Sequence, residues 1–89
     1  MQEDKINKNK KIYKALSDAF KKLKGERKLS TIAYESELPR SVVHYIEQAT
    51  KDPQLTTLWR LSEGFGLKPS ELLKLIEKEL PENWKILDE

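Results

Sequence analysis

The chain has no cysteine among its 89 residues, and it has only three glycines and one histidine. The absence of cysteine excludes disulfide bridges and thiolate metal sites within the chain. The lone histidine has no cysteine or second histidine beside it, so the sequence predicts no metal centre. No nucleophile constellation, carboxylate pair or phosphate loop is apparent. We therefore expect a protein without catalytic activity and without a cofactor, not an enzyme.

Long apolar runs are also missing. No stretch approaches the roughly 18 apolar residues that a membrane-spanning helix requires. The basic N-terminus is not followed by the apolar segment of a secretory signal. We expect a cytoplasmic protein that does not bind membranes. A chain of 89 residues, 37% hydrophobic and 36% charged, predicts one small globular domain.

The net charge of +2 conceals an uneven distribution along the chain. Residues 1–28 hold ten lysines or arginines against four acidic residues, whereas residues 29–89 hold seven against eleven. A basic segment is suited to lie near phosphate groups. Surplus lysines on a solvated helix would give the same composition, so charge alone leaves both interpretations open.

Helical periodicity predicts an all-α fold of five helices. The first helix is expected to begin near residue 10, after a flexible basic segment at residues 1–9. Its apolar stripe includes Ile12, Leu16 and Phe20, and Gly25 ends it. Short connections between helices predict a compact cluster. The remaining helices are expected at about 29–36, 39–48, 55–65 and 69–80, within a domain spanning 10–80 that is followed by a tail at 81–89.

The segment LPRSVVHYIEQA, residues 38–49, divides two kinds of side chain between the sides of one helix. At about 100° per residue, Val42, Val43 and Ile46 gather on one side and are expected to face the core. The opposite side carries hydrogen-bonding groups and fits a major groove about 12 Å wide. With the short helix before it, this segment has the pattern of a helix-turn-helix. The polar residues expected to face outward are Arg40, Ser41, His44 and Gln48.

Three stretches carry a family resemblance: LSTIAYES, LPRSVVHYIEQ and KDPQLTTLWRLSEGFGLKPSELL. On these motifs, residues 12–73 resemble the Cro/lambda-repressor (XRE) helix-turn-helix family, with the motif itself at about 29–48. The resemblance implies a five-helix lambda-repressor-like domain that binds double-stranded DNA, usually as a homodimer in transcription control. It implies base contacts from the four polar residues of the third helix. It implies phosphate contacts at the start of the second helix, including Ser30, and just after the third, at Thr50 and Lys51; Lys28 is a further phosphate candidate.

Three positions depart from the family pattern. Glu37 stands where glycine is usual in the turn, and Ala49 stands where glycine commonly follows the third helix. If either residue has a positive φ, we expect a strain of about 1 kcal/mol or more. Leu29 replaces the glutamine that typically binds phosphate in the family.

The last helix and the tail are more apolar than one core contact requires. The tail could fold back over its own molecule. We expect instead a two-fold homodimer that places two third helices about one DNA turn, near 34 Å, apart. The expected interface residues are Leu73, Leu80, Trp84, Ile86 and Leu87.

The sequence therefore predicts a sequence-specific DNA-binding transcriptional regulator. A second hypothesis is a protein-interaction module, such as an antitoxin that binds a toxin directly. The mixed charge of residues 29–89 and the acidic Glu37 keep this alternative open.

Overall fold

The computed structural model describes the backbone of residues 2–87 and the side chains of residues 8–87. Within this part of the chain the regular structure is entirely helical, with five helices and no strand, which confirms the predicted all-α class. The helices are α1 (Gln2–Lys24), α2 (Leu29–Ser36), α3 (Arg40–Gln48), α4 (Leu55–Gly64) and α5 (Pro69–Lys78).

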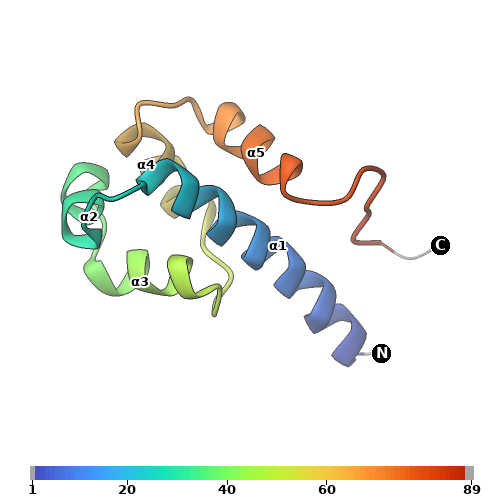
Figure 1. Cartoon of the computed structure of the whole chain (residues 1–89). Helices are drawn as coiled ribbons and strands as arrows, with labels where there is room; N and C mark the ends of the chain where they lie inside the picture. The colour runs from blue at the N-terminus through green and yellow to red at the C-terminus, as the bar shows by residue number, and fades with distance from the viewer. Residues whose placement is uncertain (1, 88–89) are drawn as a thin grey trace.

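The long helix α1 crosses the whole molecule (Figure 1). Its buried stripe includes Leu16 and Phe20, and Gly25, with a φ of 59°, ends it by donating its N–H to the Lys21 carbonyl at 3.0 Å. The helix begins at Gln2, earlier than the predicted start near residue 10, since no glycine or proline interrupts residues 2–9. The flexibility of residues 1–9 stays a prediction, and Met1 lies outside the described residues.

The other helices begin and end close to the predicted positions. Helix α2 has the expected bounds, whereas α3 begins at Arg40 with Pro39 as its N-cap. Helices α4 and α5 end one or two residues before the predicted ends at residues 65 and 80. The start of α5 is fixed by the Glu71 carboxylate, which accepts a hydrogen bond from the Lys68 N–H at 2.8 Å.

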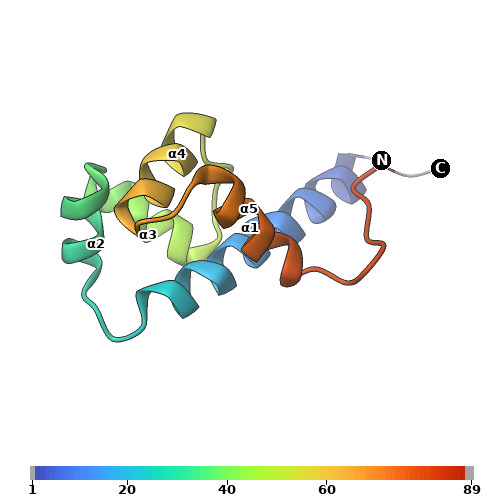
Figure 2. The ribbon, with the colours of Figure 1, turned by 90° about the horizontal axis from the view of Figure 1, so that it is seen from above.

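Helix α1 lies between α3 and α5, which pack on its opposite sides (Figures 1 and 2). Helices α2 and α4 pack against each other, and α2 also contacts α3. Phe20, Val43 and Leu61 are fully buried where these helices meet. The Phe20 and Phe65 rings lie edge to face at 5.8 Å, a favourable aromatic geometry. One shared core therefore determines how α3 is held.

Where α2 and α4 cross, there is no room for a side chain at position 64 of α4. A Cβ atom at Gly64 would lie 2.2 Å from the Ser36 Oγ. Ser36 is buried, and its hydroxyl has no hydrogen-bond partner among the described residues. This close approach requires glycine at position 64.

After α5, residues 79–87 form a non-helical tail that returns toward the N-terminal half of α1 (Figure 2). One turn is present in it, where the Trp84 N–H donates to the Pro81 carbonyl at 3.0 Å. In residues 2–87, none of the helices has the length and apolar character needed to cross a membrane.

Candidate nucleic-acid interface

The turn between α2 and α3 depends on a left-handed residue. Glu37 has a φ of 54°, and its N–H donates to the Tyr34 carbonyl at 3.2 Å. The Leu38 N–H donates to the Ala33 carbonyl at 3.0 Å, and the Leu38 side chain packs against the core. This end of α2 resembles a Schellman turn, in which glycine is the usual left-handed residue. The expected positive φ at this position is therefore present.

Helix α3 has one buried side and one exposed side. Val43 and Ile46 are buried in the core, at 0% and 1% exposure. The four candidate base-contacting residues are all exposed: Arg40, Ser41, His44 and Gln48. The sorting expected from the helical wheel is thus present. What the exposed side binds stays a prediction.

Two contacts from α1 hold the C-terminal end of α3. The buried Ser17 hydroxyl donates to the Glu47 carbonyl at 2.6 Å, and the Lys24 ammonium lies 4.0 Å from the Glu47 carboxylate. Sequence reasoning missed Ser17, although a serine within the apolar stripe of α1 was a signal. These contacts hold the C-terminal end of α3 against α1 and do not involve its four exposed candidate residues.

Two acidic residues near this surface, Glu35 and Glu37, have cationic partners. The Glu35 carboxylate lies 3.7 Å from the Arg27 guanidinium, and the Glu37 carboxylate lies 3.5 Å from Arg60. Arg40 forms no ion pair or hydrogen bond with the other described residues. Its guanidinium is therefore available to an external group, and the charge of Glu37 is partly offset.

The candidate phosphate-contacting residues lie before α2, in its first turn and just after α3. Lys28, Ser30, Thr50 and Lys51 are all exposed. The Lys51 ammonium lies 5.6 Å from the centroid of the Tyr45 ring, a cation–π contact that leaves the ammonium at the surface. Helix α2 has no side-chain N-cap, so the first N–H groups of the helix can donate hydrogen bonds to an anion.

The end of α3 also uses a left-handed residue. Ala49 has a φ of 58°, and the Thr50 N–H donates to the Tyr45 carbonyl at 3.2 Å. The chain turns sharply there, so Thr50 and Lys51 follow α3 directly. Ala49 thus adopts the same left-handed conformation as Glu37, which disfavours an L side chain.

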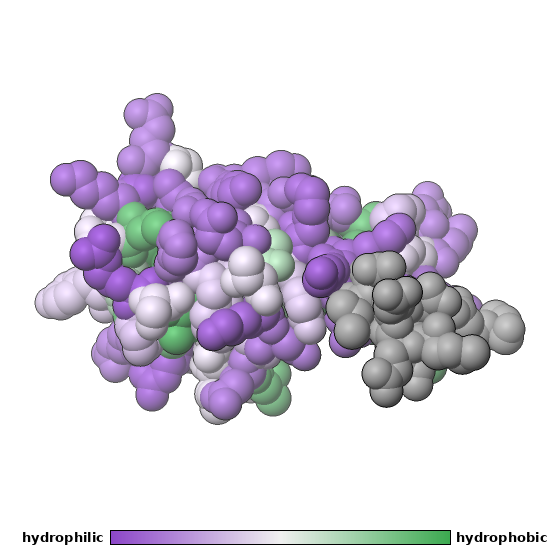
Figure 3. Space-filling view, turned by 90° about the horizontal axis from the view of Figure 1, so that it is seen from below, coloured by the Kyte–Doolittle hydropathy of each residue, from purple (hydrophilic) through white to green (hydrophobic). Residues whose placement is uncertain are grey.

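The surface seen from the α3 side is mostly hydrophilic, with isolated apolar spots (Figure 3). A polar surface of this kind suits contact with phosphates and base edges better than it suits a dry protein interface. No group of three or more histidine, cysteine or acidic residues arranged to hold a metal ion occurs in the described part of the chain.

The candidate dimer residues lie elsewhere, on α5 and the tail. Leu73, Ile86 and Leu87 are exposed, whereas Leu80 and Trp84 are partly buried. Helix α5 and the tail that follows it lie on the other side of α1 from α3 (Figure 1). A contact made through them would leave α3 accessible.

Comparisons of this chain with protein-family models, curated proteins and solved structures give no significant match.

Proposed function

We propose that this protein binds double-stranded DNA sequence-specifically and regulates transcription by occupying its site, with α3 in the major groove. The observation that supports this most is the exposed polar side of α3, which lies directly opposite the buried Val43 and Ile46. The family resemblance of residues 12–73 to lambda-repressor-like helix-turn-helix domains supports the same proposal. No catalytic step is part of it.

Each exposed residue of α3 has a suitable chemical role. The Arg40 guanidinium can donate two hydrogen bonds to the O6 and N7 atoms of guanine, and the Gln48 amide can pair with the N6 and N7 atoms of adenine. His44 and Ser41 can each donate or accept a hydrogen bond at a base edge. These contacts would select the sequence.

Phosphate contacts would supply much of the affinity and would make it depend on salt. Lys28, Lys51 and the first turn of α2 are the candidate sites. The ion pairs of Glu35 with Arg27 and of Glu37 with Arg60 reduce the repulsion that these carboxylates would exert on DNA.

A protein-interaction module, such as an antitoxin, is the second candidate. A specific feature favours it: Leu55 and Trp59, one turn apart on α4, are 67% and 50% exposed. Large apolar side chains at the surface often mark a protein contact. In that case a toxin or other protein partner would bind α4.

A salt titration separates the two candidates. Binding to random duplex DNA should weaken steeply with salt, by about 0.9 logarithmic units per decade for each neutralised phosphate. A slope near zero would contradict DNA binding and favour the protein-partner hypothesis.

Alanine replacement of Arg40, His44 and Gln48 tests the reading side of α3. We expect the preference for a selected DNA site to fall by about tenfold or more, since each good base contact contributes about 1–3 kcal/mol of discrimination. Thermal unfolding should change little, since all three side chains are exposed. Alanine replacement of the exposed Lys74 on α5 is the control and should leave the preference for the selected DNA site intact. Unchanged selectivity in the triple variant would exclude α3 as the reading helix.

The regulator is further proposed to act as a homodimer through α5 and the tail. The apolar residues exposed there are available for such a contact. A two-fold dimer would present two α3 helices to a palindromic site.

A further inference from the structure

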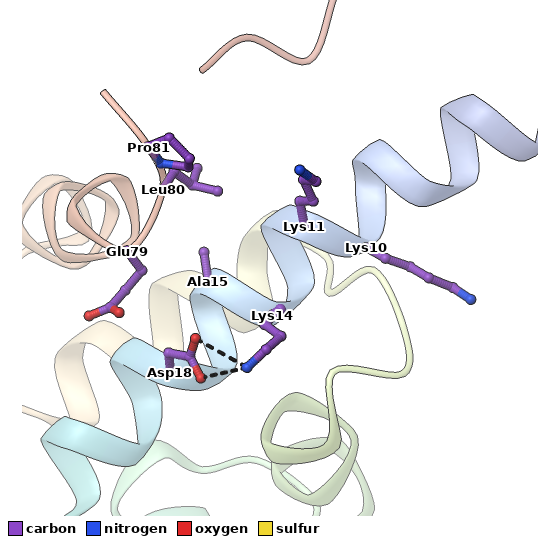
Figure 4. Close-up of a pocket in the computed structure, with 8 residues that line it drawn as sticks. All are labelled: Lys10, Lys11, Lys14, Ala15, Asp18, Glu79, Leu80 and Pro81. Atoms are coloured by element: carbon purple, nitrogen blue, oxygen red, sulfur yellow. Dashed lines mark hydrogen bonds and ion pairs between the residues drawn. The ribbon is translucent and has the colours of Figure 1, made fainter. Parts of the chain in front are cut away.

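A hollow of about 400 Å³ lies between α1 and the end of α5. Ala15 on α1, together with Leu80 and Pro81, forms its apolar part. In Figure 4, Lys11 points toward the gap beside Leu80 and Pro81, whereas Lys14 is turned along α1 and pairs with Asp18 at 3.2 Å. The hollow is therefore a groove with an apolar part and a charged edge, which is formed by Lys10, Lys11, Lys14, Asp18 and Glu79.

The tail that passes near this groove leaves two of its apolar side chains exposed. Ile86 is 38% exposed and Leu87 is 79% exposed. Among the described residues, the side chains of residues 81–87 form no hydrogen bond or ion pair with the rest of the chain. One chain thus carries both an unfilled groove and an uncovered apolar segment.

The uncompensated charges of the groove and the tail are opposite. Three lysines and two carboxylates line the groove; Lys14 pairs with Asp18, and Glu79 pairs with Lys22, which leaves Lys10 and Lys11 without an ion pair among the described residues. Residues 81–89 contain three acidic residues and one lysine. A segment with the composition of the tail is therefore attracted to this end of α1, and salt would weaken the attraction.

We propose that the groove between α1 and α5 receives the tail of a second copy of this chain, and that the two copies exchange tails reciprocally. Each copy offers one groove and one tail, so a two-fold axis satisfies both at once and closes the assembly. The exchange covers Ile86 and Leu87, which the chain's own fold leaves exposed. This inference rests on the proposed function and deepens its homodimer by naming the contact.

Sedimentation of the full chain tests the interface. The wild-type protein should dimerise, and Leu87→Lys should raise the dimer dissociation constant at least about tenfold, because it replaces an apolar contact with a positive charge beside the lysines of the groove. Leu55→Lys is the matched control, since Leu55 is equally apolar and 67% exposed but lies on α4. Dissociation caused by Leu55→Lys and not by Leu87→Lys would overturn the proposal.

Engineered cysteines test the exchange itself, because the chain contains none of its own. Lys11→Cys and Ile86→Cys are made in separate chains, mixed and oxidised. We expect a disulfide between the two variants, in larger yield than each variant forms with itself. A double variant that carries both cysteines in one chain is the control. If it forms an intramolecular disulfide and the mixture of single variants forms none, the tail covers its own groove and the inference is wrong.

The DNA titration distinguishes this failure from failure of the proposed function. A protein that stays monomeric but retains a steep salt dependence would refute the tail exchange and leave DNA binding supported. A protein that dimerises but shows no salt-dependent DNA binding would refute the proposed DNA binding and leave the tail exchange supported.

Discussion

At the scale of single residues, two turns of the chain place a non-glycine residue at a positive φ, where glycine is usual. Glu37 and Ala49 are left-handed at φ values of 54° and 58°, where an L side chain is strained and glycine is not. The two residues flank α3, the helix that carries the candidate base contacts. The sequence pattern indicated these positions because glycine was expected at both, but only the structure shows their φ angles.

Ala49→Gly should raise the free energy of unfolding by about 0.5–1 kcal/mol, because glycine relieves the strain at a positive φ. Glu37→Gly should act in the same direction, reduced slightly by the loss of the exposed pair with Arg60. Chemical denaturation measures both. Lys74→Gly, within α5, is the control and should destabilise by up to about 1 kcal/mol. A loss of stability in Ala49→Gly would show that the left-handed residue is not strained.

At the scale of helices, individual contacts fix how the elements cross. The Ser17 bond to the Glu47 carbonyl ties α1 to α3, and the approach of Ser36 to Gly64 ties α2 to α4. Periodicity showed which sides of the helices turn inward. It could not show which pairs meet, because each pair joins residues far apart in the chain.

Gly64→Ala should lower the free energy of unfolding by about 1–3 kcal/mol, since its methyl group would overlap the Ser36 hydroxyl and backbone. Ser36→Ala alone should be near neutral or stabilising, because that buried hydroxyl has no partner among the described residues. The double variant should recover part of the loss, as a double-mutant cycle can measure. Strictly additive effects would contradict a direct contact between the two positions.

At the scale of the whole molecule, α1 lies between the two candidate functional regions and contacts the helices of both. Helix α3, which carries the candidate base contacts, and α5, whose end borders the groove, pack on opposite sides of α1 (Figure 1). The proposed DNA binding and the proposed tail exchange would therefore use different surfaces and would not compete. The Lys22–Glu79 pair, at 2.6 Å, holds the end of α5 to α1 next to the groove.

The Glu79 carboxylate, through a hydrogen bond and its charge, raises the pKa of Lys22 above the usual 10.5. The pair should therefore contribute stability fully below about pH 10.5 and lose that contribution as pH rises through the higher folded-state value. Thermal unfolding of wild type and Lys22→Met should differ slightly near pH ~8 and converge toward pH ~12. Lys21→Met, the neighbouring control, should show no such convergence. A difference that stays constant to high pH would mean that the ion pair does not contribute.

Local sequence was sufficient to predict the five helices, most of their bounds and the two sides of α3, because these follow from periodicity and from residues that begin or end helices. The same periodicity assigned the four candidate base-contacting residues to the exposed side of one helix. Packing in three dimensions was needed to show that Arg60 and Arg27, and not Arg40, pair with the nearby carboxylates. Packing also brings the lysine-rich part of α1 beside the end of α5, and no local pattern predicts such proximity between residues distant in sequence.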